Sequence, residues 1–217
     1  MNLLLTDTIC IPGKATQNLR AFRRWTTSGE YPERGDYFYL AGDIWMDNSM
    51  ETLLHNQIKG LFAIILGQLV MTQRSGRYCG DRMRLVNVAA DISCEPDGMF
   101  ISHTSRNDGR VTWEQGSQSL EVIGSPDMVL EVVSSSSVQK DTTLMRKLYA
   151  AADIAEYWLI NPLGGELSFD ILRLQSRGYA PVRKSAGWLK SSVFGKSFRL
   201  VEEESDSELP EYRLLVR

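Results

Sequence analysis

Two carboxylates, Asp97 and Glu131, are the strongest candidates for chemistry in this 217-residue chain. Glu131 lies in an almost continuously apolar segment, Asp127 to Ser134, which is typical of a strand buried on both faces. A carboxylate among buried valines costs several kcal/mol unless it is neutralised, paired or bound to a metal. Glu131 therefore binds a metal ion, pairs with a buried Arg or Lys, or lies at an exposed strand end.

Asp97 is interpreted together with Glu131, because Pro96-Asp97-Gly98 taken alone is a common turn signal. A strand is expected to begin at Gly98, which leaves room beside the Asp97 carboxylate. Two hard oxygen ligands from neighbouring strands suit Mg²⁺, which also keeps waters. One such water can become the nucleophile for phosphodiester hydrolysis. Asp127 lies four residues before Glu131, roughly 13 Å away in a strand, so these two cannot chelate one ion.

The order of several motifs resembles the Uma family of putative restriction endonucleases, which belongs to the PD-(D/E)XK nuclease superfamily. The similarity covers roughly Phe22 to Leu200, and its most specific part is a Pro-Asp-x-x-x-Glu-Val strand followed by Glu-Tyr-Trp-Leu. The segments that carry it are Gly42-Asp43-Ile44, the helix around His55, Pro96-Asp97, Pro126 to Ser134, Asp141 with Tyr149-Ala150-Ala151, and Glu156 to Pro162.

The resemblance implies a restriction-endonuclease-like core of the α/β (α+β) class, with a central mixed β-sheet flanked by helices. It implies a Mg²⁺-dependent endonuclease that hydrolyses DNA, with Mn²⁺ as a possible substitute. Asp97 and Glu131 would be the metal ligands, and the main-chain carbonyl of Val132 the third. Asp43, where family members usually carry glutamate, either approaches the metal or is an exposed hairpin residue. His55 is expected to be a capping or surface histidine.

The lysine of the superfamily is missing from its two usual positions. It often follows the glutamate by two positions, where this chain has Val133, or lies on the following helix, where this chain has Met145. The nearest substitutes are Lys140 and Lys147. Lys147 is rotated by about 200° from Met145 on a helix and should point outward, while Met145 should pack inward. Lys140 is therefore the candidate catalytic lysine, although each could be an ordinary surface lysine.

The predicted elements place these residues in one domain, residues 1–201, followed by an acidic C-terminal tail, residues 202–217, that should be mobile and solvated. Apolar spacing predicts a helix over Met50 to Val70, with Leu54, Ile58, Leu61, Ile65 and Leu69 packed on a sheet. Asp141 should cap a helix over Thr142 to Asp153. A further helix is expected over Gln17 to Ser28. Strands are expected over Tyr37 to Leu40, Ile44 to Met46, two within Arg77 to Val88, Gly98 to Ser102, Leu120 to Ile123, Asp127 to Ser134, Glu156 to Ile160, Leu167 to Leu174, Tyr179 to Arg183 and Phe198 to Val201.

Composition limits the setting and the partners. A net charge of −3 and a pI near 5.5 count against a broadly basic nucleic-acid-binding surface, although the acidic tail lowers both values. Three scattered cysteines and two histidines make a structural zinc site improbable and favour a reducing, cytoplasmic setting. The longest apolar stretch falls short of the ~20 residues of a membrane span.

Two questions stay open at this stage. The same fold could be a catalytically decayed module that binds nucleic acid or a partner protein, because the family lysine is missing. The substrate could also be RNA or a branched structure instead of duplex DNA. A homodimer is possible, because two active sites related by a two-fold axis cut both strands of a duplex most simply.

Overall fold

A mixed six-stranded sheet forms the centre of the computed structural model, which describes residues 11–32, 34–164, 167–203 and 210–217. Its strand order is β12-β11-β10-β9-β6-β3, and only β9 and β10 run parallel. The strands are β3 (Gly76–Gly80), β6 (Gly98–Ser102), β9 (Met128–Val132), β10 (Glu156–Asn161), β11 (Ser168–Gln175) and β12 (Gly178–Pro181). A mixed sheet flanked by helices is the predicted fold class, which is confirmed.

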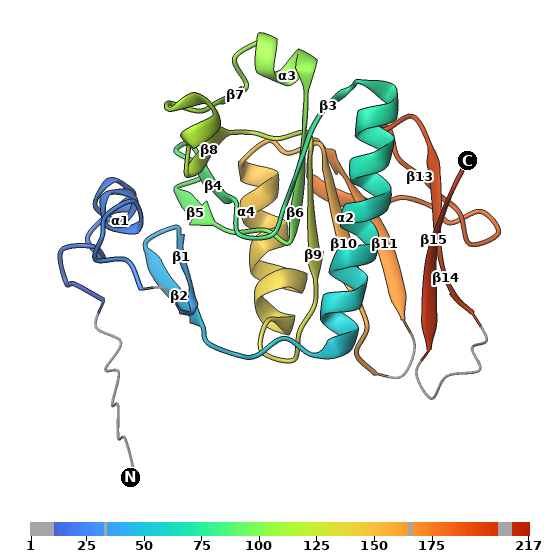
Figure 1. Ribbon diagram of the computed structural model, residues 1–217, viewed down its shortest axis with the longest axis horizontal. Coiled ribbons are helices and arrows are strands. Elements are labelled where there is room, and N and C mark those ends of the chain that lie inside the picture. The colour runs from blue at the N-terminus through green and yellow to red at the C-terminus, as the bar shows by residue number, and fades with distance from the viewer. Residues whose placement is uncertain (1–10, 33, 165–166, 204–209) are drawn as a thin grey trace.

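A second six-stranded sheet, of order β2-β1-β5-β4-β8-β7, lies beside the first (Figure 1). Its strands are β1 (Asp36–Leu40), β2 (Asp43–Asp47), β4 (Arg84–Asn87), β5 (Ile92–Cys94), β7 (Val111–Thr112) and β8 (Glu121–Gly124). The helix α1 (Leu19–Thr26) lies within the helix predicted over Gln17 to Ser28 and packs Phe22 and Trp25 against β1. The short helix α3 (His103–Asn107) and a 3₁₀ turn (Gly116–Gln118) complete this part of the chain.

A third sheet ends the chain, with the order β13-β14-β15. Its strands are β13 (Leu189–Lys190), β14 (Ser197–Glu203) and β15 (Glu211–Val216). β15 pairs with β14 along its whole length, from Phe198↔Val216 to Glu203↔Glu211. The prediction of a mobile acidic tail over residues 202–217 is therefore wrong for Glu211–Val216, and residues 204–209 lie outside the described part. Leu214 is buried against the core, which gives this segment apolar area to stabilise it.

The long helix α2 (Leu53–Gln73) covers one face of the central sheet (Figure 1). Ile58, Phe62, Leu66 and Val70 are buried there, with Met128, Leu130 and Val132 of β9 in the same cluster. Of the five residues predicted to pack on the sheet, only Ile58 is among these buried residues, because α2 is apolar around much of its surface. The rest of that stripe, Leu54, Leu61, Ile65 and Leu69, is partly buried against the same cluster, and α2 also contacts β15.

By length and composition alone, α2 could cross a membrane. It has 21 residues, and its most apolar 18-residue window has a mean hydropathy of 1.3. This is weak evidence, because a helix packed in the core of a protein has the same properties. The packing of Phe62 and Leu66 onto the central sheet fits a core helix.

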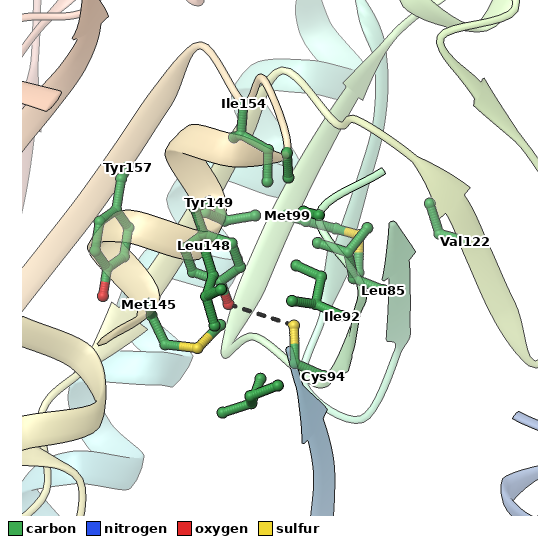
Figure 2. Close-up of a cluster of buried hydrophobic side chains, with 14 of the residues drawn as sticks. Leu85, Ile92, Cys94, Met99, Val122, Met145, Leu148, Tyr149, Ile154 and Tyr157 are labelled. Atoms are coloured by element: carbon green, nitrogen blue, oxygen red, sulfur yellow. Dashed lines mark hydrogen bonds between the residues drawn. The ribbon is translucent and has the colours of Figure 1, made fainter. Parts of the chain in front are cut away.

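The other face of the central sheet is covered by a π-helical segment (Lys140–Leu144) that runs into α4 (Met145–Ala151). Figure 2 shows the Met145, Leu148 and Tyr149 side chains in the cluster that also holds Met99 of β6 and Cys94 of β5. Met145 is 1% exposed, so its predicted inward orientation is confirmed. Met145 is therefore an apolar residue of the core.

Asp141 does not cap a helix, which corrects the sequence prediction. Helical backbone already begins at residue 138, and the Asp141 N–H donates to the Ser137 carbonyl over 2.8 Å. The turn before it is closed by the Ser137 hydroxyl, which accepts from the Ser134 N–H at 2.9 Å. Asp141 therefore lies inside the helix and is buried. The wider π-helical turn directs both Lys140 and Asp141 inward.

Candidate active site

Asp97 and Glu131 meet where two antiparallel strands stop pairing. The ladder between β6 and β9 ends at Gly98↔Leu130. Beyond it, the Val132 N–H donates to Asp97 Oδ2 at 2.7 Å, and the Asp97 N–H lies 3.5 Å from Glu131 Oε2. The Asp97 carboxylate thus continues the contact between the strands where the main-chain hydrogen bonds end, and both carboxylates line the same cleft.

Glu131 is 4% exposed and lies on the face of β9 that looks toward α4. The Tyr149 hydroxyl donates to Glu131 Oε1 at 2.5 Å. Burial raises the pKa of Glu131 to about 8, and the charges of Asp141 and Asp97 add to the rise, while Lys140 and Tyr149 oppose it. Proton or cation binding thus relieves an incompletely compensated buried charge.

The pKa of Asp97 is shifted in the opposite direction. Burial alone would raise its pKa, but His55, the Lys59 ammonium and the Val132 N–H together hold the pKa of Asp97 below its ordinary value. Lys59 Nζ lies 3.4 Å from Asp97 Oδ1, and His55 Nε2 lies 3.8 Å from Oδ2. Asp97 is therefore ionised throughout the neutral range. In this pair, the charge of Asp97 is compensated by its neighbours, whereas the charge of Glu131 is stabilised further when a cation binds.

Lys140 is brought to the site and Lys147 is not. Lys140 pairs with Asp141 and its ammonium lies 5.2 Å from the centre of the Phe38 ring. Burial would lower the pKa of Lys140, but Glu131, Asp141 and Asp97 raise it above its ordinary value, so Lys140 is charged. Lys147 is exposed on α4, on the outward side that the helical geometry predicts.

His55 and Lys59 are site residues that the sequence predictions did not find. The expected capping or surface role of His55 is wrong, because its side chain is buried and faces Asp97 and Glu51; only its main-chain N–H takes part in the cap, donating to Thr52 Oγ1. Lys59 had no predicted role. Their four-residue spacing puts both on one helical face, and this was the available signal, but nothing in the sequence says which elements that face contacts.

Asp43 and Asp127 lie outside the site. Asp43 is exposed and pairs with Leu40 in the β1–β2 hairpin; Asp47, at the end of β2, lines the cleft instead. Asp127 accepts hydrogen bonds from the Ser102 N–H at 2.6 Å and from the Ser105 hydroxyl at 2.8 Å. It therefore fixes the start of α3, far along the strand from Glu131.

Gly98 makes room for the Tyr78 side chain. A Cβ at Gly98 would overlap the Tyr78 hydroxyl, so the missing side chain accommodates Tyr78 of β3. Burial raises the pKa of Tyr78, and the nearby charge of Asp97 adds to this rise. Tyr78 therefore stays a neutral phenol packed beside the site.

The cleft around the pair is lined by more polar than apolar residues and has about 170 Å³ of space for water-sized molecules. Its walls come from the β1–β2 hairpin, the first turns of α2, the serine-rich loop after β9 and the π-helical segment, through Asp47, His55, Ser135 and Lys140. Carboxylate and carbonyl oxygens in such a cleft are the ligands that Mg²⁺ prefers. A second set, Glu51, His55 and Asp97, has ligand atoms within 4.8 Å of one another.

Comparison with known proteins gives a family match and a similar fold. Residues 19–200 match the family model Uma2, described as "Putative restriction endonuclease". The fold is similar to the crystal structure of a putative nuclease belonging to DUF820 from Anabaena variabilis, with a TM-score of 0.62, 18% identity, and coverage of 82% of this chain and 90% of that one. At this identity the likeness shows a shared fold. Among curated proteins, no match was found.

Proposed function

The chain belongs to the Uma2 family of putative restriction endonucleases, and from this premise we propose that it is a Mg²⁺-dependent endonuclease that hydrolyses phosphodiester bonds in DNA. The observation that carries the proposal is the meeting of Asp97 and Glu131 at the end of the β6–β9 ladder. Two carboxylates in one cleft repel each other. A cation bound by both would compensate this repulsion.

Asp97, Glu131 and the main-chain carbonyl of Val132 would hold the metal. In an extended strand the N–H and C=O of one residue point to the same side. The Val132 N–H points to Asp97, so its carbonyl does as well. A bound Mg²⁺ or Mn²⁺ supplies Lewis acidity toward a phosphoryl oxygen and lowers the pKa of a water.

The remaining groups position and compensate charge. Tyr149 fixes the orientation of Glu131 through its hydroxyl. Lys140, charged and buried next to Glu131, supplies positive potential where negative charge grows on the phosphate oxygens. In the reaction, a water oxygen forms a bond to phosphorus and the bond from phosphorus to one sugar oxygen breaks. Lys140 takes the role of the family lysine, whose position on the helix is occupied by Met145 in this chain.

DNA is the proposed substrate because the family description is that of a restriction endonuclease. We propose a cytoplasmic protein, and a homodimer wherever both strands of a duplex are cut, since the described residues of each chain hold one such carboxylate pair. The alternative is a module that binds nucleic acid or a partner and has lost its chemistry. The buried and charged Lys140 argues for retained chemistry.

The test is a substrate panel at fixed Mg²⁺. Duplex DNA, single-stranded DNA, RNA of the same sequence and a branched DNA are incubated with the purified chain, with and without EDTA. Internal cuts in duplex DNA that EDTA abolishes support the proposal. Cuts in RNA or branched DNA alone would keep the metal chemistry and replace the substrate. Binding without cutting in any divalent metal would overturn the enzyme in favour of a binding module.

A further inference from the structure

The Lys59 ammonium lies among three carboxylates at the edge of the site. Its Nζ is 3.0 Å from Asp81 Oδ2, 3.4 Å from Asp97 Oδ1, and in contact with Glu51 Oε1. The Lys59 side chain is 9% exposed, although Glu51 and Asp81 are 40% and 51% exposed. A single positive charge thus offsets part of the negative charge of this cluster, which Glu51, Asp81 and Asp97 form.

His55 adds an independent feature to this cluster. It is 8% exposed, and its Nε2 lies 3.9 Å from Glu51 Oε1 and 3.8 Å from Asp97 Oδ2. Its Nδ1 is buried and has no hydrogen-bond partner among the described residues. An imidazole with this little hydrogen bonding, aimed at two carboxylates, is an available metal ligand. Two carboxylates and one imidazole suit a transition-metal cation such as Mn²⁺.

The ammonium and a divalent ion compete for the same carboxylates. Glu51, His55 and Asp97 could converge on one cation, but Lys59 Nζ already contacts Glu51 and Asp97. A metal bound to those two carboxylates would lie within a few ångströms of the ammonium, and like charges at that separation in a half-buried site repel strongly. Lys59 therefore excludes a second ion.

We propose that the Lys59 ammonium takes the place of a second divalent cation beside the metal held by Asp97 and Glu131, and that its removal opens a Mn²⁺ site formed by Glu51, His55 and Asp97. The inference rests on the proposed function, because Asp97 is shared between the two sites. The wild-type chain then binds one ion, and its second positive charge is built into α2. The cluster keeps this charge at any metal concentration.

The test counts bound Mn²⁺ per chain by equilibrium dialysis and calorimetry, in the absence of nucleic acid. The wild type should bind one ion, Lys59→Met two, and Lys59→Arg one, because arginine keeps the charge. Adding His55→Ala to Lys59→Met should return the count to one. Lys147→Met, at an exposed lysine on α4, is the matched control and should bind one.

The outcomes separate this inference from the proposed function. One ion in the wild type and one in each folded variant, Lys59→Met and Lys59→Gln, overturns the inference and leaves the nuclease site standing, as does a count of two ions in the wild type. No ion in the wild type overturns both. Lys59→Met removes the ammonium that three carboxylates share. For this reason Lys59→Gln, which keeps a hydrogen-bonding side chain, is counted as well, and each variant is checked for a cooperative thermal transition. Two ions in either folded variant supports the inference.

Discussion

At the scale of single residues, two buried glutamates in adjacent strands show what a site requires. Glu156 of β10 is 0% exposed and accepts hydrogen bonds from the Trp158 indole N–H at 3.0 Å, the Ser191 hydroxyl at 2.6 Å and the Ser192 N–H at 2.6 Å. Its charge is fully accommodated by the fold. Glu131 receives a short bond from Tyr149 at 2.5 Å and a long one from the Asp97 N–H at 3.5 Å. Glu156 is therefore structural, and Glu131 has capacity left for a ligand.

The pH dependence of stability follows from the raised pKa of Glu131. Without metal, folded Glu131 keeps its proton up to about pH 8, whereas the unfolded chain loses it near 4.5. The folded state binds more protons between these values, so this contribution to stability is full below pH 4.5 and is lost as the pH rises toward 8. Urea unfolding in EDTA from pH 5 to 9 should show it as the difference between wild type and Glu131→Gln. Parallel curves for the two proteins would contradict the assignment.

Metal should reverse that trend, because a metal ligand must be deprotonated. The rise in melting temperature caused by Mg²⁺ should grow from pH 6 to pH 8 in the wild type. It should be absent in Glu131→Gln at every pH. A rise that is independent of pH, or that persists in the variant, would place the ion elsewhere.

Tyr149→Phe tests the group that orients Glu131. The variant removes a hydroxyl that lowers the pKa of Glu131 and takes the shorter of two hydrogen bonds from a buried carboxylate, which costs about 1–3 kcal/mol. We expect lower stability and weaker metal binding at neutral pH, with the binding partly restored at pH 9. Titration by calorimetry at both values measures this. Unchanged affinity at pH 7 would mean that Tyr149 has no effect on the site; Tyr212→Phe in the third sheet is the control.

At the scale of elements, the site is built at strand ends and completed by two helices. The strands could be predicted because each carries its own signal: the apolar run around Glu131 and the turn at Pro96-Asp97-Gly98. The approach of α2 to the site could not be predicted. His55 and Lys59 precede Asp97 by 42 and 38 residues in the sequence, and they reach it only through packing. The π-helical turn at Lys140 has no residue signature either, and Asp141 looked like a cap for that reason.

Gly98→Ala tests the packing that sets the start of β6. The added methyl would overlap the Tyr78 hydroxyl and displace either Tyr78 or the strand next to Asp97. We expect a loss of stability of about 1–3 kcal/mol, the usual cost of overpacking, and weaker metal binding. Tyr78→Phe removes the overlapping oxygen, so the double variant should recover part of both losses. Strictly additive effects in this double-mutant cycle would show that the two residues do not interact.

At the scale of the whole molecule, the cleft depends on parts of the chain that the sequence could not relate. The hairpin places Phe38 against the Lys140 ammonium and Asp47 within 2.9 Å of the Ser136 hydroxyl in the loop after β9. The family resemblance predicted the central sheet and the Asp97–Glu131 pair, because those motifs are local. It did not predict β15, whose alternating residues follow an acidic run that indicated a solvated tail. Contacts between distant segments account for most of what was missed.

The most direct test of the whole account is the nicking of supercoiled plasmid by the purified chain in Mg²⁺, Mn²⁺ or EDTA, beside Glu131→Gln and Asp127→Asn. Asp127 precedes the same strand but fixes α3, so it controls for general damage to β9. We predict metal-dependent nicking by the wild type and Asp127→Asn, abolished by EDTA, and a loss of about 100-fold or more in Glu131→Gln, the scale on which a single electrostatic group acts in catalysis. Equal nicking by wild type and Glu131→Gln would contradict the carboxylate site, and no nicking by the wild type in any metal would contradict the nuclease itself.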